Sequence, residues 1–159
     1  MNRIRIIAVG KLKEEFYRAA QEEYLKRLRP YLKLEIVETS DLPCPERSTP
    51  AQEEQVLKQE GALIRSKLQP GDFVVVLDRK GKEIDSLEFA GLVQERLASG
   101  KPLAFVIGGS LGVDPELLKE AQMRLSFSKL TFPHQLFRVV LLEQIYRAMK
   151  INRGERYHK

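Results

Sequence analysis

The chain has 159 residues, of which 43% are hydrophobic and 31% charged, with a net charge of +5, one cysteine and two histidines. This length and composition predict one globular domain over residues 1–159, and the cysteine and histidine counts exclude an intrachain disulfide and the usual zinc-ligand sets. Because no apolar run is long enough for a signal peptide or for the roughly 18 residues of a membrane span, we expect a cytoplasmic protein that uses no membrane and no metal.

The first part of the chain predicts a strand, a helix and a second strand. Residues 3–10 are apolar and β-branched, which is typical of a strand, and residues 12–28 place apolar side chains at helical spacing. Residues 32–38 alternate apolar and charged side chains, so this strand has one wet face and is expected near a sheet edge. The prolines of residues 40–50 predict a loop.

The middle of the chain continues this alternation. A helix is predicted over residues 51–68, and the apolar run 72–78, bounded by turn signals, predicts a buried central strand. Residues 86–98 have helical spacing with Ser86 as the candidate N-cap residue, and residues 102–109 predict another buried strand.

The last third predicts two helices separated by a short strand. The first helix covers residues 114–122, with Asp114 as the N-cap residue and proline at the first helical position. A short strand over 124–128 and a final helix over 134–150 follow. Strands that alternate with helices indicate the α/β class, with a largely parallel sheet that helices cover on both faces.

Ligands bind such sheets beyond the carboxyl ends of the strands, so the loops of interest follow Val9, Leu77, Ile107 and Phe127. The loop after Ile107 reads GGSLGVDP and leads into a helix N-terminus, which lets the backbone approach a nucleotide-like ligand. The spacing does not match G-x-G-x-x-G, so a dinucleotide fingerprint is excluded. A tight strand-to-helix turn explains these glycines equally well.

The final helix is apolar around most of its circumference. Such a helix is buried on two sides, either against a second copy of the chain across a twofold axis or as the central helix of one domain. We expect the first arrangement, a homodimer. His134 opens this helix after Pro133 and is interpreted as a capping residue rather than a catalytic one.

Positive charge is concentrated at the carboxyl end. Residues 147–159 contain five cationic side chains against Glu155 alone, so most of the net charge lies in this segment. A cationic cluster of this kind is the expected footprint of phosphate contacts with a nucleic acid. A solvated, disordered tail is the alternative, and charge alone does not separate the two.

Four segments together resemble a known family. They are AVGKLKEEF at 8–16, VVLDRKGK at 75–82, FVIGGSLGV at 105–113 and LSFSKLTFPHQLFRVVLLEQIYRAMKINRGERYHK at 125–159. They occur in the order typical of the small single-domain SPOUT (α/β-knot) methyltransferases that act on 23S ribosomal RNA. The resemblance spans the whole chain, and its last segment is the longest and most specific.

The resemblance implies a parallel sheet between helices, with a carboxyl-terminal part tucked through a loop as a trefoil knot. General topology would not lead to that expectation, since true knots are nearly absent from proteins. It implies S-adenosyl-L-methionine as the cofactor, bound by three loops of the knot. The cofactor-binding positions that match the family are Leu77, Gly108, Phe127, Ser128, Lys129, Leu130, Thr131 and Phe132.

The reaction implied by the resemblance is methylation of N3 of a pseudouridine in 23S rRNA within the assembled ribosome. The enzyme has to position the methyl donor in line with N3 and remove the imide proton. We expect His158, Tyr157 and Arg147 to act at the target base over the cofactor pocket of a partner subunit, with His158 as the candidate proton acceptor and Glu143 as a second one. The residues expected to bind RNA phosphates, together with Arg147, are Lys150, Arg153 and Arg156.

Two hypotheses from other classes remain open at this point. The chain could be a non-enzymatic module that binds rRNA in the ribosome, in which case the glycine loop is only a turn. It could also be a small-molecule α/β enzyme that uses a different nucleotide, with an incidental basic tail. Binding of S-adenosylmethionine separates the first alternative from the enzyme, and deletion of residues 151–159 tests the second.

Overall fold

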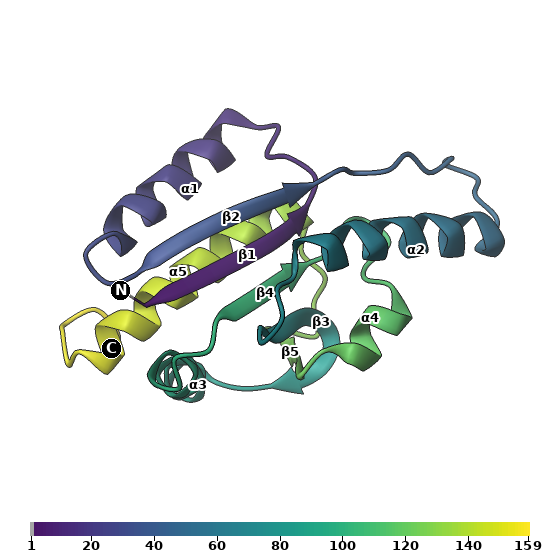
Figure 1. Cartoon of the computed structure of the whole chain (residues 1–159). Helices are drawn as coiled ribbons and strands as arrows, with labels where there is room; N and C mark the ends of the chain where they lie inside the picture. Colours follow the sequence, from purple (N-terminus) through teal and green to yellow (C-terminus); the bar gives the residue numbers. More distant parts are fainter. Residues whose placement is uncertain (1) are drawn as a thin grey trace.

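A computed structural model describes residues 2–159 of the chain. Five parallel strands form one sheet in the order β2-β1-β4-β3-β5 (Figure 1). The strands are β1 (Arg3–Val9), β2 (Lys33–Thr39), β3 (Phe73–Glu83), β4 (Leu103–Ile107) and β5 (Met123–Ser126). The helices are α1 (Glu15–Leu28), α2 (Pro50–Lys67), α3 (Ser86–Ala98), α4 (Pro115–Glu120) and α5 (His134–Asn152). The predicted α/β class with a parallel sheet is confirmed.

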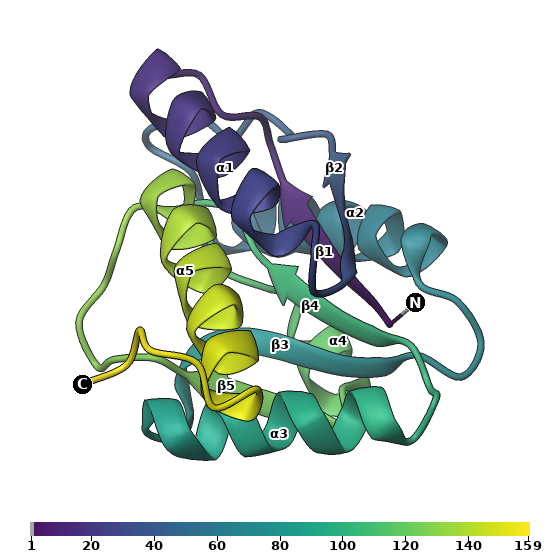
Figure 2. The ribbon, with the colours of Figure 1, turned by 90° about the vertical axis from the view of Figure 1, so that its left-hand side faces the viewer.

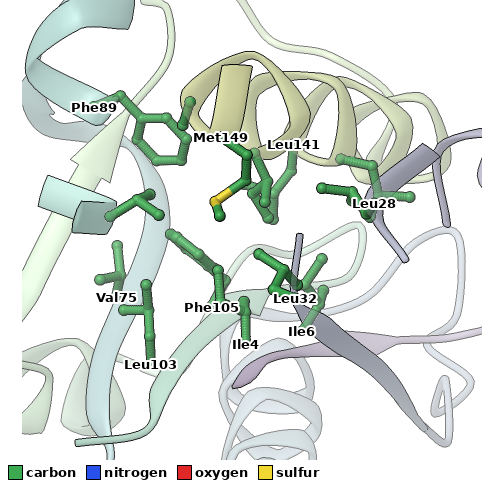
Figure 3. Close-up of a cluster of buried hydrophobic side chains, with 14 of the residues drawn as sticks. Ile4, Ile6, Leu28, Leu32, Val75, Phe89, Leu103, Phe105, Leu141 and Met149 are labelled. Carbon is green, nitrogen blue, oxygen red and sulfur yellow. The ribbon is translucent and has the colours of Figure 1, made fainter. Parts of the chain in front are cut away.

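Different helices cover the two faces of the sheet. Helices α1, α3 and α5 lie side by side on one face, and α2 and α4 lie on the other (Figures 1 and 2). Alternation along β1 sends Ile4 and Ile6 into the core under α5, where they meet Phe105 and Met149 (Figure 3). Ile7 points instead into the smaller core under α2 and α4. Successive side chains of a strand point to opposite faces of the sheet, and this alternation gives the fold its two cores.

The burial of each strand follows its place in the sheet. Every residue of β4, the central strand, is buried, as expected for an apolar run covered on both faces. The β2 strand is an edge strand and is mostly half-buried, so its predicted edge position is confirmed. The run predicted as a buried central strand, 72–78, lies in β3, next to the centre, and its three consecutive valines are buried.

Several element boundaries differ from the predictions for local reasons. Helix α1 begins at Glu15 rather than at residue 12, because the backbone N–H of Lys13 donates to the side chain of Gln135 and Leu12 is buried. The N-cap of α3 is Asp85, not Ser86. The Asp85 carboxylate accepts the N–H of Glu88, and the Glu88 side chain accepts the N–H of Asp85, which completes a capping box.

The β3 strand ends five residues later than predicted, at Glu83 rather than at residue 78, and contains a bulge. Leu77 and Lys82 both pair with Leu125 of β5, so residues 78–81 leave the ladder between them. A Cβ on Gly81 would lie 2.6 Å from the Arg124 carbonyl carbon and oxygen, so only glycine allows this close approach. Pairing with β5 on both sides of the bulge is what carries the strand past Leu77.

Two buried arginines connect distant parts of the fold. Arg5 of β1 donates to Asp72 at 2.8 Å, at the amino-terminal end of the sheet. Arg138 of α5 is 1% exposed and donates to the Glu38 carboxylate and to the carbonyl of Gly10. Buried charges need such partners, so Arg138 attaches α5 to the carboxyl ends of β1 and β2.

Within residues 2–159, no helix has both the length and the apolar character that crossing a bilayer requires. The same part of the chain contains no cluster of three or more His, Cys, Asp or Glu side chains suited to a metal ion.

Candidate active site

A cavity of about 740 Å³ lies beyond the carboxyl ends of β4 and β5, beside the bulge of β3 and the start of α5. Three of the four loops singled out in the sequence line it, namely those after Leu77, Ile107 and Phe127. The loop after Val9 does not, so that expectation is wrong. Its first residue, Gly10, instead donates its N–H to Thr39 and accepts a hydrogen bond from Arg138.

The turn after β4 forms one wall of the cavity. Gly112 has φ +89° and donates its N–H to the Gly109 carbonyl at 3.0 Å, which closes a tight turn. A Cβ on Gly108 would lie 2.3 Å from the Gly112 carbonyl oxygen. These glycines therefore make a tight turn and line a cavity at once, and the two interpretations of the GGSLG segment are compatible.

The bulge in β3 supplies the charged part of the lining. Asp78, Arg79 and Lys80 all face the cavity. Arg124 donates to the Asp78 carboxylate at 3.1 Å, and Arg79 donates to the Thr131 hydroxyl at 3.3 Å, which connects the bulge to the loop after β5. These three residues were not predicted as site residues. The available signal was their place directly after the apolar run that ends at Leu77.

The loop after β5 is held in shape by its own serines. Ser126 donates its hydroxyl to the Ser128 carbonyl at 3.0 Å, and the Ser128 hydroxyl accepts the N–H of Leu130 at 3.0 Å. Behind the loop, Phe137 of α5 lies 5.2 Å from the Phe127 ring, centroid to centroid. Both aromatic rings line the cavity beside this loop.

Seven of the eight predicted cofactor residues line this cavity: Leu77, Gly108, Phe127, Ser128, Leu130, Thr131 and Phe132. Lys129 is exposed and is not among the lining residues. His134 does line the cavity, and it is the first helical residue of α5 rather than its cap, because Pro133 occupies the N-cap position. Its interpretation as a capping residue is therefore wrong.

The three predicted catalytic residues meet in a second place, along the far half of α5. Arg147 donates to the Glu143 carboxylate through Nε at 2.9 Å and Nη2 at 2.6 Å, and through Nη1 to Nδ1 of His158 at 3.0 Å. The Tyr157 hydroxyl donates to the same Glu143 oxygen at 3.3 Å. None of these four residues lines the cavity of its own chain.

Two side chains of this cluster have raised pKa values. The hydrogen bonds to Glu143 raise the pKa of the Arg147 guanidinium, so it stays charged at every accessible pH. Burial, followed by the charge of Glu143, raises the pKa of the Tyr157 phenol above 10. Tyr157 is therefore a hydrogen-bond donor at neutral pH, and both oxygens of Glu143 already accept hydrogen bonds.

The predicted RNA-binding residues differ in their contacts within the chain. Lys150 forms an ion pair with Glu155 at 2.7 Å. Arg153 is exposed and lies over the Tyr31 ring, 4.6 Å from its centroid. Arg156 is exposed and takes part in none of the ion pairs found in residues 2–159.

Comparison with known proteins bears on what the cavity is for. Residues 2–158 match the family model described as "Predicted SPOUT methyltransferase". The chain belongs to the SPOUT methyltransferase family. Its α/β-knot fold is that of the family, and the family's activity requires a methyl donor.

Relatives of this SPOUT methyltransferase match along nearly their whole length. "Ribosomal RNA large subunit methyltransferase H" of Carboxydothermus hydrogenoformans is 51% identical over 157 residues, which are 98% of this chain and 99% of the relative. The protein of the same name from Symbiobacterium thermophilum is 52% identical over 160 residues, covering 99% of both chains. That from Clostridium botulinum (strain Langeland) is 52% identical over 157 residues, covering 98% of this chain and 99% of the relative.

Proposed function

We propose that this chain transfers a methyl group from S-adenosyl-L-methionine to N3 of a pseudouridine in 23S rRNA of the assembled ribosome. The observation that carries the proposal is the match of the whole chain, at about half identity, to large-subunit rRNA methyltransferases. The cavity beside β3, β4 and β5 supports it, because a module that only binds RNA has no use for such a cavity.

The cavity suits S-adenosylmethionine in size and in chemistry. Ligand sites of this class have volumes of roughly 300–1,000 Å³ and mostly apolar walls with a few polar groups, and this cavity fits both descriptions. Leu77, Phe127 and Phe137 offer apolar contact to an adenine ring, and the backbone around Gly108 and Ser128 offers donors and acceptors. Asp78, the only acidic residue of the lining, and Arg79 offer opposite charges to the amino-acid end.

S-adenosylmethionine, when bound, supplies an activated methyl group on its sulfonium. The residues of the chain have to position the base and accommodate the charge that N3 acquires when its proton leaves. Arg147 and the Tyr157 hydroxyl donate to Glu143 here. Redirected to the target base, they can bind the carbonyl oxygens beside N3, where that charge is delocalised. His158 keeps its proposed role in moving the N3 proton. Because its Nδ1 accepts a hydrogen bond from Arg147 here, this role requires that Arg147 releases Nδ1 when the target base binds.

We further propose that two copies of the chain assemble and that the tail of one closes the cavity of the other. Support comes from the separation of the two sites within one chain, since the Arg147 cluster lies outside the cavity lining. It also comes from the apolar surface beside the cavity, where Leu130 is 72% exposed and Phe132 37% exposed. Binding to the cytoplasmic ribosome would then rest on Arg153 and Arg156.

Two measurements test this function. Calorimetry should detect binding of S-adenosylmethionine to the intact chain and to a chain lacking residues 151–159, because the deleted tail lies outside the cavity lining. Methylation of ribosomes by the shortened chain should be lost. Absence of cofactor binding would refute the enzyme and favour the ribosome-binding module, and full activity of the shortened chain would refute the role of the tail.

A further inference from the structure

Helix α5 ends in a turn that reverses the chain. Gly154 has φ +65°, its N–H donates to the Ile151 carbonyl at 3.0 Å, and the N–H of Glu155 donates to the Lys150 carbonyl at 3.0 Å. These two bonds define a Schellman motif, which needs a residue in the left-handed conformation and therefore favours glycine. The carboxyl-terminal residues consequently leave the helix axis at its end (Figure 2).

A side-chain contact fixes the tail just after this turn. The Oε2 atom of Glu155 accepts from Lys150 Nζ at 2.7 Å and from the Tyr31 hydroxyl at 2.7 Å. Tyr31 lies in the turn between α1 and β2, so the contact attaches the tail to a part of the chain 124 residues away. We call Tyr31, Lys150 and Glu155 the tail latch.

Glu155 of the latch lies two residues before Tyr157 and three before His158. Beyond it, the Tyr157 ring meets Tyr146 edge-on at 4.9 Å between centroids, and the Arg147 guanidinium lies 4.7 Å from the centre of the Tyr157 ring. His158 then reaches Arg147 at 3.0 Å. The turn at Gly154 sets the direction of the tail, and Glu155 anchors it before Tyr157 and His158 are placed.

We propose that the tail latch orients Tyr157 and His158 for methyl transfer, and that Lys150 acts inside the protein as a positioning residue instead of contacting an RNA phosphate. This rests on the proposed function, in which the tail acts at the target base. The phosphate contacts of the tail are left to Arg153 and Arg156.

The energetics favour a positioning role over a stabilising one. An ion pair at the surface contributes little to folding stability, because water screens it and two long side chains lose freedom. Holding reactive groups in the productive geometry affects the rate far more, since misplacement by about 1 Å can cost about a hundredfold. The negative Glu155 carboxylate also offsets the Lys150 charge that would attract a phosphate.

The test compares latch variants with a phosphate-contact variant on ribosomes. Tyr31→Phe, Lys150→Met and Glu155→Gln should each lower kcat by about tenfold with little change in KM. Each change leaves Tyr157 and His158 less well positioned, whereas binding of the ribosome is unaffected. The salt dependence of ribosome binding should be unchanged in Lys150→Met, whereas Arg156→Met should reduce its slope by about one unit. A Lys150→Met slope that falls as far as that of Arg156→Met would overturn the proposal.

A charge exchange provides the matched control. Lys150→Glu and Glu155→Lys should each lower kcat, and the double variant should recover most of it, because it restores the ion pair with the same net charge. A double variant as inactive as its parents would count against the latch.

Amide hydrogen exchange of the protein without ribosomes separates this proposal from the proposed function. Exchange of the Gly154 and Glu155 amides, whose N–H groups are hydrogen-bonded, should accelerate in Tyr31→Phe and Glu155→Gln and stay slow in Arg156→Met. Unchanged exchange in the latch variants would overturn the latch. A wild-type protein that methylates no rRNA would instead refute the proposed function, while the exchange rates still decide whether the latch holds the tail.

Discussion

Gly108 is the residue at which the shape of the cavity depends most on the absence of a side chain. A Cβ there would lie 2.3 Å from the carbonyl oxygen of Gly112, and 2.7 Å from its carbonyl carbon and from Cγ2 of Val113. These atoms cannot move aside as the end of a flexible side chain can. The sequence marked this glycine as either a turn residue or a ligand-binding one. The distances show why both are required: the turn can be tight enough to form the cavity wall only without a side chain at this position.

Gly108→Ala should therefore weaken S-adenosylmethionine binding at least tenfold, because the turn has to open to admit the methyl group. Calorimetry measures the change. The control is Gly91→Ala in α3, where a Cβ meets nothing within 4 Å. That variant should bind normally and gain up to about 1 kcal/mol of stability from its higher helix propensity. Normal cofactor binding by Gly108→Ala would show that the cavity is not the cofactor site.

Glu60 of α2 carries a buried carboxylate. It is 4% exposed, and its Oε2 accepts the N–H of Leu42 at 3.3 Å. Burial raises the pKa of the Glu60 carboxyl above its ordinary value of 4.5, and the nearby Asp41 carboxylate adds to the effect. The folded state thus holds this proton more tightly than the unfolded chain. The stability it contributes is present below about pH 4.5 and is lost as the pH rises through the raised pKa.

Glu60→Gln should consequently stabilise the protein at pH 7.5, by on the order of 1 kcal/mol, and the gain should shrink toward pH 4.5. Reversible urea unfolding at the two pH values measures the difference. Glu54→Gln, on an exposed position of the same helix, serves as the control and should show no such trend. A gain that is the same at both pH values would contradict the raised pKa.

Among the elements, the helices follow from local sequence more closely than the strands do. Asp114 and the proline after it begin α4 as predicted, because capping acts within a few residues. The β3 strand was predicted to end at residue 78, because Arg79, Lys80 and Gly81 do not have strand character. Pairing with β5 carries the strand past them, and tertiary pairing of this kind cannot be seen in a single segment.

The N-cap of α3 allows the stability contribution of a single capping residue to be tested. Asp85→Ala should cost about 1 kcal/mol of unfolding free energy, since the carboxylate that accepts the Glu88 N–H is lost. Asp85→Asn should retain most of the stability, because asparagine caps helices as well as aspartate. Thermal unfolding compares the two. Equal stability of Asp85→Ala and the wild type would show that the cap contributes nothing.

At the scale of the whole molecule, composition and alternation predicted the α/β class but not the strand order. The order β2-β1-β4-β3-β5 arises from contacts between segments far apart in the chain, such as Arg138 with Gly10. General rules of topology also argue against a knot, so only the resemblance pointed to one. The positive charge of the tail could be seen in the sequence, but no sequence pattern predicts the contacts of the tail with Tyr31 and Glu143.

A mixing experiment tests whether two chains share each active site. A Gly108→Val chain and a chain lacking residues 151–159 should each be inactive alone. Mixed dimers contain one intact cavity facing one intact tail, so an equal mixture should regain about a quarter of the wild-type activity if subunits assort randomly. No recovery in mixtures shown to contain mixed dimers would mean that each tail serves its own cavity.

The central claim is that this cavity and this tail methylate one base of the ribosome. Purified protein and isotopically labelled S-adenosylmethionine are incubated with ribosomes that lack the modification, and the 23S rRNA is mapped by mass spectrometry. The account predicts one labelled methyl group on N3 of a single pseudouridine, absent when residues 151–159 are deleted. Label at many positions, on another ring atom, or on no RNA at all would contradict it.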